Sequence, residues 1–363
     1  MGKKKKVGFS STFFLLSLTT IISLIGLLFV FESSTAESFS TFGNPYHYVK
    51  SQAMWLGLGF ITLFISSFIP IKFWQKISPI LFILTLIALI LVFIPGFGLK
   101  LNGARRWFSL FGLITIQPVE IAKFSIVTFF AAWMTKHQKL LPFLFLTSLP
   151  IILLMLQPDL GSTLVVTGIA LGMYFIAGGQ MKYIFLVSGV SLILVLGAIF
   201  SSEYRMKRVS TFFNPELDPL GSSFHIRQIT LALGRGGLLG QGIGESKQKY
   251  NYIPEASSDS ILAIVAEEIG FVGSMFVINL FLAYFLVTFR IASKFPTDSF
   301  EHLLAMGILI WISTQTLLNI SAVVALVPLT GMPLPFFSYG GSSLVMVMLA
   351  TGVLTKLSLE KVK

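Results

Sequence analysis

The sequence predicts an all-α polytopic membrane protein with about ten transmembrane helices. Hydrophobic residues make up 55% of the 363-residue chain, and charged residues make up only 11%. A soluble domain of this length carries far more charge on its surface. Several apolar runs also reach about 18 residues or more, the length that a helix needs to cross a hydrocarbon layer about 30 Å thick.

The apolar runs predict a single membrane domain that covers residues 1–363. The first run follows Lys3 to Lys6. These lysines resemble the start of a signal peptide, but the run behind them is long enough to span and more spans follow, so we expect an uncleaved first helix. The predicted spans are 11–31, 51–70, 78–97, 118–135, 141–156, 160–177, 183–200, 260–289, 303–329 and 338–355.

The distribution of lysine and arginine predicts that both termini are cytoplasmic. With that orientation, the short inner connections hold more than half of the 26 basic residues. Two outer segments break the trend, namely loop 98–117 and a large extracytoplasmic loop of about 201–258 between the seventh and eighth spans. Because long loops cross the membrane largely regardless of charge, these exceptions do not overturn the orientation. They are the segments where we expect a substrate to bind.

Composition also excludes several classes of function. The chain has no cysteine, which excludes disulfides and thiolate metal sites, and its four histidines lack zinc-protease spacing. The net charge of +11 is spread over short connections, so nucleic acid is not a predicted partner. Neither a P-loop nor a proper dinucleotide-binding glycine motif is present, which excludes an ATPase or dinucleotide-binding protein.

The large outer loop is cationic and rich in glycine. Arg205 and Arg208 lie near its start, and the stretch FHIRQITLALG has the spacing of a helix lying in the membrane interface. In residues 234–246, GRGGLLGQGIGES, glycine backbone beside cationic side chains suits a phosphate. A flexible loop whose glycines only permit turns is an equally good interpretation.

Asp259 lies where this loop meets the eighth span. A carboxylate at the head-group level can act as a general base on a sugar hydroxyl or hold a metal ion. Taken alone, the residue types favour a simpler role, in which Asp259, Ser257 or Ser258 caps the helix that begins at Ile261.

Four charged residues lie within predicted spans. Glu267 and Glu268 lie in the eighth span, where we expect them to face the protein interior. Glu120 and Lys123 in the fourth span are three residues apart and can pair on one helix face. That pair is either a neutralised structural link or part of a functional site.

The sequence NGARRWF places Arg105, Arg106 and Trp107 at the membrane surface. Two arginines beside a tryptophan indicate an anion-binding site with a platform for a sugar or lipid. An aromatic anchor in contact with lipid head groups is the alternative. Asp159 and residues 334–343 supply further polar groups at helix ends, where tight turns would explain them equally well.

Seven segments, in this order, resemble the SEDS family (shape, elongation, division and sporulation), of which FtsW and RodA are members. The resemblance spans most of the chain. The segments are NGARRW (102–107), QPVEIAK (117–123), QPDLGS (157–162), GGLLGQGIGES (236–246), PEASSD (254–259), EEIGFVG (267–273) and GMPLPFFSYGGSS (331–343).

This resemblance implies a multi-pass glycosyltransferase of the bacterial cytoplasmic (inner) membrane that polymerises lipid II into glycan strands. Its implied partners are a class B penicillin-binding protein, other proteins of the division or elongation machinery, and membrane lipids. It also implies that Asp259 is the essential catalytic residue, that Glu120 and Lys123 are the family's charge pair, and that Trp107 is its extracellular tryptophan.

The chain departs from the family near the key acid. The family commonly has PE-x-HTDFI, whereas residues 254–261 read PEASSDSI, so serines 257, 258 and 260 replace histidine, threonine and phenylalanine. Ser258 keeps a hydroxyl and is assigned to substrate binding. The FNPELDP and GMPLPFFSYGGSS segments resemble the FtsW branch more than RodA.

The resemblance suggests a mechanism in which Asp259 deprotonates the acceptor's 4-hydroxyl, directly or with a divalent cation such as Mg²⁺ or Mn²⁺. Cationic side chains would stabilise the departing diphosphate. The candidates for this role are Arg105, Arg106, Arg205 and Arg208. A lipid flippase or transporter, with the four intramembrane charges lining its path, is one alternative. A non-catalytic scaffold for a penicillin-binding protein is the other.

Overall fold

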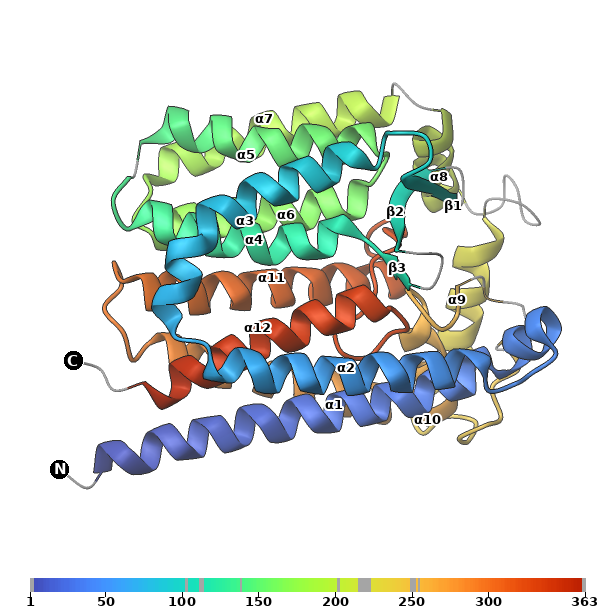
Figure 1. Cartoon of the computed structure of the whole chain (residues 1–363). Helices are drawn as coiled ribbons and strands as arrows, with labels where there is room; N and C mark the ends of the chain where they lie inside the picture. The colour runs from blue at the N-terminus through green and yellow to red at the C-terminus, as the bar shows by residue number, and fades with distance from the viewer. Residues whose placement is uncertain are drawn as a thin grey trace.

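The structure is a computed structural model in which most of the chain is helical (Figure 1). It describes residues 3–101, 104–110, 114–137, 139–200, 203–214, 223–248, 253 and 255–360. The helices are α1 (Lys3–Phe42), α2 (His47–Phe68), α3 (Ile71–Leu91), α4 (Pro118–Met134), α5 (Leu140–Leu156), α6 (Leu160–Ile176), α7 (Met181–Phe200), α8 (Glu203–Phe213), α9 (Phe224–Gly236), α10 (Ile261–Ala292), α11 (Phe300–Val323) and α12 (Gly341–Leu359). The strands are β1 (Gly98–Leu101), β2 (Ala104–Leu110) and β3 (Ile114–Ile116).

Each of the ten predicted spans corresponds to one long helix, namely α1 to α7 and α10 to α12. Six of the described helices are long and apolar enough to cross a membrane, and α5 and α6 are shorter apolar helices. In Figure 1 these helices run side by side, and both termini lie at one end of the bundle. Helices α8 and α9 and the three strands lie at the opposite end, which we call the loop end.

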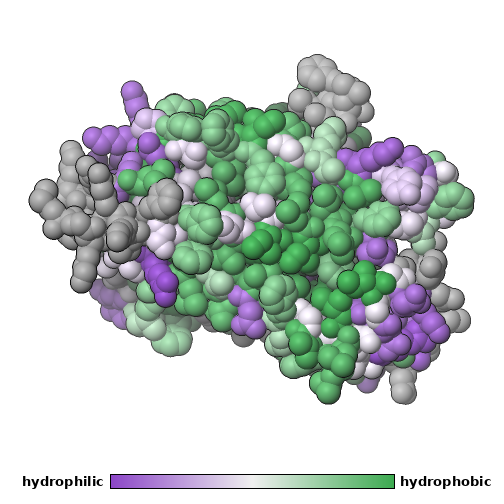
Figure 2. All heavy atoms as spheres, turned by 90° about the horizontal axis from the view of Figure 1, so that it is seen from below, coloured by the Kyte–Doolittle hydropathy of each residue, from purple (hydrophilic) through white to green (hydrophobic). Residues whose placement is uncertain are grey.

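The outside of the bundle is apolar. Figure 2 shows a broad hydrophobic band across the middle of one face, with hydrophilic residues gathered toward both ends. Large apolar side chains are exposed on several helices, including Phe64 on α2, Ile83 on α3 and Phe276 on α10. Such an apolar band is stable in contact with lipid tails. The helices also satisfy their own backbone hydrogen bonds, as a membrane-spanning segment must. The chain is therefore a polytopic membrane protein.

Helix α1 is longer than the predicted span 11–31. It continues to Phe42, where Gly43 takes a φ of +66° and its N–H bonds to Phe39 O at 2.9 Å. Polar residues end the apolar run, but they do not end the helix. The Ser33 hydroxyl, for example, donates to Phe29 O one turn earlier at 2.7 Å, so it is satisfied within the helix. The apolar run therefore predicts the membrane-buried part, and a glycine in the left-handed region ends the helix.

A small sheet between α3 and α4 is absent from the sequence prediction, which expects a loop at 98–117. Strand β1 pairs with β2, and β2 pairs with β3, both antiparallel. β3 consists of the β-branched residues Ile114, Thr115 and Ile116, which favour strands. With only three residues, β3 is too short to show an alternating pattern.

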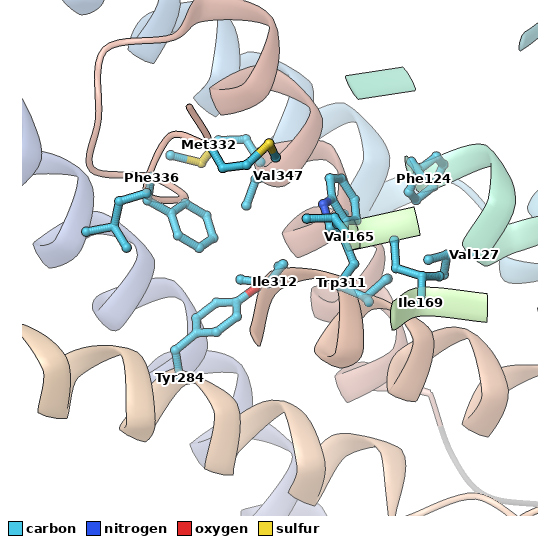
Figure 3. Close-up of a cluster of buried hydrophobic side chains, with 14 of the residues drawn as sticks. Phe124, Val127, Val165, Ile169, Tyr284, Trp311, Ile312, Met332, Phe336 and Val347 are labelled. Atoms are coloured by element: carbon cyan, nitrogen blue, oxygen red, sulfur yellow. The ribbon is translucent and has the colours of Figure 1, made fainter. Parts of the chain in front are cut away.

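Helix α11 runs through the core and packs against α4, α6 and α10. Its Trp311 is fully buried, and Figure 3 shows it beside Phe124 of α4 and Val165 of α6. On the other side, Tyr284 of α10 and Phe336 meet edge to face with ring centroids 5.2 Å apart. Because α11 is enclosed in this way, its polar side chains need partners within the protein.

Candidate functional site

Asp259 lies just before α10, at the loop end of the bundle. The helix begins at Ile261 with Ser260 as its N-cap, and the Ser260 side chain makes no capping hydrogen bond. The first turn is closed by the backbone, with Ala263 N donating to Ser260 O at 2.9 Å. The capping role that the residue types favour for Asp259 and the serines before it is therefore wrong. The Asp259 carboxylate is half-buried.

Asn319 of α11 fixes the backbone at Asp259. Its Nδ2 donates to Asp259 O and to Met332 O, each at 2.8 Å. Gly331, which precedes Met332, has a φ of +69°, and a Cβ at that position would lie 3.9 Å from Asp259 Oδ2. The segment that joins α11 to α12 therefore passes directly beside the carboxylate.

The carboxylate itself is held through Ser260. The Ser260 hydroxyl donates to Asp259 Oδ1 at 3.2 Å, and His225 Nε2 of α9 lies 2.8 Å from Ser260 Oγ. The Ser258 hydroxyl donates instead to Glu255, at 3.2 Å to its carbonyl and 3.0 Å to its Oε2. Substrate binding by Ser258 stays a prediction, whereas the sequence does not predict the contact with His225.

The predicted pairing of Glu120 and Lys123 is confirmed in α4. Lys123 Nζ donates to Glu120 Oε1 at 2.8 Å, and the lysine is completely buried. The same Nζ donates to Gln315 Oε1 of α11 at 2.8 Å and lies 5.8 Å from the ring centroid of Trp311. Gln315 Nε2 in turn donates to Pro333 O at 2.9 Å. The charge pair is therefore connected to the segment that passes Asp259.

Arg105 and Arg106 of β2 hold backbone carbonyls of neighbouring turns. Arg106 Nε donates to Gln157 O at 3.1 Å, and its Nη2 donates to the carbonyl of the following proline. Arg105 Nη1 donates to Phe93 O at 3.3 Å. A guanidinium has five N–H donors, so these bonds leave others for an anion. Trp107 is half-buried on the same strand. Anion and sugar binding by these three residues stays a prediction.

Asp159 caps the N-terminus of α6. It is the N-cap, and its two carboxylate oxygens accept from Ser162 N at 3.1 Å and from Ser162 Oγ at 2.8 Å. A Cβ on Gly161 would lie 2.6 Å from Thr330 O, so this helix end packs closely against the chain leading to Gly331. Asp159 therefore acts as the N-cap of α6, a role that the sequence does not predict.

Glu267 and Glu268 face the interior as predicted, and each is 1% exposed. Glu267 accepts from the Ser246 hydroxyl and from the amide N–H groups of the next two residues at 3.4 and 3.3 Å. Arg235 Nη1 lies 4.0 Å from its Oε1. The Glu267 carboxylate thus contacts both the end of the glycine-rich loop and the end of α9.

The glycine-rich loop packs against a kink in α10. Gly270 has a φ of +68° and a ψ of −168° there, and the backbone carbonyls of the two preceding glutamates accept from Gln241 N at 2.9 Å and Gly242 N at 3.0 Å. A Cβ on Gly240 would lie only 2.2 Å from the second of these carbonyls. These two amides bind helix carbonyls, so the phosphate interpretation is wrong for them. The glycines permit close packing instead.

Arg205 and Arg208 lie on α8 at the loop end. Their side chains fall outside the described part of the structure, so their contact with a diphosphate stays a prediction. Lys207 on the same helix is exposed.

A divalent cation would find a carboxylate ligand at Asp259. Among the described residues, no group of three or more His, Cys, Asp or Glu side chains could hold a metal ion. Mg²⁺ is commonly bound by one or two carboxylates together with water and substrate phosphates. The described residues therefore fit a cation that arrives with a phosphate-bearing substrate, and no preformed metal cage is found among them.

Known proteins similar to this chain cover nearly all of it. A family model described as "Cell cycle protein", for FtsW, RodA and SpoVE, matches residues 12–363. Stage V sporulation protein E of Bacillus subtilis (strain 168) is 36% identical over 352 residues, 95% of this chain and 96% of that protein. The probable peptidoglycan glycosyltransferase FtsW of Geobacter sp. (strain M18) is 35% identical over 351 residues, 94% of this chain and 95% of that protein.

Solved structures share the fold. One, described as "Structural coordination of polymerization and crosslinking by a peptidoglycan synthase complex", has a TM-score of 0.76 and 26% identity and covers 95% of this chain and 96% of its own. RodA of Thermus thermophilus has a TM-score of 0.69 and 26% identity, over 94% of each chain. The higher identity to FtsW places the chain closer to FtsW than to RodA. The chain belongs to the FtsW/RodA/SpoVE family of cell cycle proteins.

Proposed function

We propose that this chain is a peptidoglycan glycosyltransferase that polymerises lipid II into glycan strands at the outer face of the bacterial cytoplasmic (inner) membrane. The observation that carries the proposal is the geometry at Asp259. Its carboxylate is half-buried, lies outside the helix that follows, and sits on backbone that Asn319 fixes. A relative named probable peptidoglycan glycosyltransferase FtsW, 35% identical over nearly the full length, supports the class of reaction.

In the proposed reaction Asp259 is the general base. It removes the proton from the 4-hydroxyl of the acceptor sugar as that oxygen attacks the anomeric carbon of the donor. The bond from this carbon to the diphosphate breaks with inversion, and undecaprenyl diphosphate leaves with the electron pair. Ser258, the neighbouring hydroxyl, is assigned to substrate binding. A divalent cation, when bound, would neutralise charge on the diphosphate.

Cationic side chains at the loop end are proposed to stabilise the departing diphosphate. Negative charge builds up on this group as its bond breaks, so a fixed cation stabilises the transition state more than the ground state. Arg205 and Arg208 on α8 are assigned this role, together with the N–H groups of Arg105 and Arg106 that do not hold carbonyls. Trp107 would provide an apolar platform for the sugar or lipid.

The partners of three of the four intramembrane charges argue against the transporter alternative. Glu120 and Lys123 are closed into a network with Gln315, and Glu267 binds the glycine-rich loop. A translocation path needs side chains that can exchange these partners for a substrate. Lipid transport by proteoliposomes that form no polymer would nonetheless establish the transporter.

The proposed membrane topology places both termini in the cytoplasm and the loop end outside. This orientation is supported by the excess of lysine and arginine at the inner connections. We propose a class B penicillin-binding protein as the partner, within the division or elongation machinery. The structural match to a peptidoglycan synthase complex supports such an assembly.

The decisive test is polymerisation of lipid II by purified protein, alone and with the partner. Asp259→Asn keeps the size of the side chain and removes the base, so we expect the glycan product to disappear. Asp298→Asn, at an exposed aspartate in the connection between α10 and α11, is the matched control and should polymerise normally. Full polymerisation by Asp259→Asn would reject the proposal.

Growth of cells that carry the variants, and the polymerisation assay with a chelator, separate the remaining alternatives. If Asp259→Asn supports normal growth while substitutions at the partner interface do not, the scaffold alternative is correct. Adding a chelator to the unchanged protein tests for the cation, since loss of product that Mg²⁺ or Mn²⁺ restores would establish a metal requirement.

A further inference from the structure

We propose that His225 and Ser260 form a positioning relay that orients the carboxylate of Asp259. The relay is a chain of two hydrogen bonds that runs from α9, through the first residue before α10, to the acid. This inference rests on the proposed role of Asp259 as general base, and it assigns a function to two residues outside the proposed catalytic machinery.

The geometry joins the start of α9 to the start of α10. His225 lies in the first turn of α9, which packs against α10. Its Nε2 is 2.8 Å from Ser260 Oγ, and Ser260 Oγ is 3.2 Å from Asp259 Oδ1. Ser260 is completely buried, and although it occupies the N-cap position its hydroxyl makes no capping bond to the helix. The hydroxyl is thus directed to the imidazole and the carboxylate.

The number of protons fixes the direction of the relay. A serine hydroxyl has one hydrogen, and an ionised carboxylate can only accept. The hydrogen of Ser260 therefore goes to Asp259 Oδ1, and the lone pairs of Ser260 Oγ face His225. Nε2 of His225 must then carry a hydrogen and donate it, which sets the tautomer of the ring. Both hydrogen bonds point toward the acid.

This arrangement limits rotation of the carboxylate. The backbone of Asp259 is already held by Asn319, so the side-chain torsions are the remaining freedom. A bond to Oδ1 from a buried, oriented hydroxyl restricts the plane of the carboxylate. A base fixed in this way needs less reorganisation when it meets the acceptor hydroxyl.

The sequence around the acid agrees with this role. Position 260 is a serine in this chain, where the family that it resembles commonly has phenylalanine. A phenyl ring has no hydroxyl group and so cannot donate a hydrogen bond to a carboxylate. The histidine that the family commonly has before the acid is also replaced, by Ser257. In this chain the imidazole of His225 on α9 instead contacts Ser260, the residue that follows the acid.

The test measures kcat and KM for lipid II polymerisation. His225→Leu and Ser260→Ala each break the relay, and we expect kcat to fall about tenfold or more with little change in KM. His225→Gln keeps a donor N–H, and Ser260→Thr keeps the hydroxyl, so each should recover much of the lost rate. His137→Leu, at an exposed histidine between α4 and α5, is the control and should leave kcat unchanged.

A double variant distinguishes a relay from two separate effects. His225→Leu with Ser260→Ala should lose no more activity than Ser260→Ala alone, because both act through one path. Losses that multiply would overturn the relay. So would a normal kcat in His225→Leu and Ser260→Ala while Asp259→Asn is inactive, and that result would leave the proposed function intact. Failure of the proposed function would appear separately, as an active Asp259→Asn.

Discussion

Gln315 and Asn319 lie one turn apart on α11, and their side-chain amides donate to consecutive carbonyls, those of Pro333 and Met332. Gln315 also accepts from Lys123, whereas Asn319 also donates to Asp259 O. One face of a single buried helix therefore links the charge pair of α4 to the backbone of the proposed catalytic acid. Both links pass through the segment that joins α11 to α12.

Asn319→Leu should damage the site without touching the acid. Leucine is similar in size but cannot donate, so Asp259 O and Met332 O would each lose a partner. We expect a loss of about 2 kcal/mol in the free energy of unfolding and a clear loss of polymerisation. Thermal unfolding in detergent and the lipid II assay measure the two effects. Asn279→Leu, on an exposed face of α10, is the control, and equal behaviour of both variants would contradict the role of Asn319.

Lys123→Met should destabilise the bundle strongly. It removes one partner of a completely buried ion pair and leaves the carboxylate of Glu120 uncompensated, at an expected cost of about 3 kcal/mol or more. Adding Glu120→Gln should recover part of the lost stability, because the second charge is then gone as well. The midpoint of thermal unfolding measures both steps, with the exposed Lys136→Met as the control. A double variant less stable than Lys123→Met would argue against the pair.

Gly270→Ala should release the glycine-rich loop from α10. A Cβ at Gly270 would lie 2.3 Å from Gly240 N, and the φ of +68° is strained for alanine. We expect a loss of about 2 kcal/mol or more in stability and faster proteolysis of residues 237–248. Gly57→Ala on α2, where no atom lies within 4 Å of an added Cβ, should leave both unchanged. Normal protease resistance in Gly270→Ala would show that the loop is held by other contacts.

Glu360, at the end of the bundle where both termini lie, should make the free energy of unfolding depend on pH. Burial raises the pKa of Glu360, and the nearby Glu301 raises it further, against the opposing effect of Lys356 and Lys72. The folded protein therefore binds this proton more tightly than the unfolded chain, so the contribution to stability falls as pH rises.

Glu360→Gln is accordingly expected to raise the midpoint of thermal unfolding at neutral pH. The gain should shrink as pH falls below the usual range of a glutamate, where the unchanged residue is protonated in both states. Asp298→Asn controls for the loss of one negative charge near this end. A gain that is the same at all pH values would point to packing as its cause.

Much of the fold follows from the sequence because the membrane imposes a simple rule. Each span must satisfy its own backbone hydrogen bonds, so a long apolar run predicts a helix. Each of the ten predicted spans corresponds to a helix in the structure. The sheet at β1 to β3 is short and lies outside this rule, and α1 continues beyond its apolar run. Helix ends depend on single residues such as Gly43, which hydropathy does not detect.

The acid of the candidate site could be found from its sequence motif, but its supporting contacts could not. His225, Gln315 and Asn319 form hydrogen bonds with residues that are distant in the sequence. A local sequence pattern therefore cannot predict these bonds. One signal was available. Gln315 and Asn319 are amide side chains four positions apart inside a mainly apolar span, which indicates a functional or connecting face.

The separate attachment of the Asp259 backbone has a genetic consequence. Asn319 holds the carbonyl of this residue through a bond that does not involve the carboxylate. An allele that changes only the side chain should yield a folded protein that inserts in the membrane and assembles normally but cannot react. Such copies would occupy the places of active ones, and the allele should be dominant negative when both are expressed.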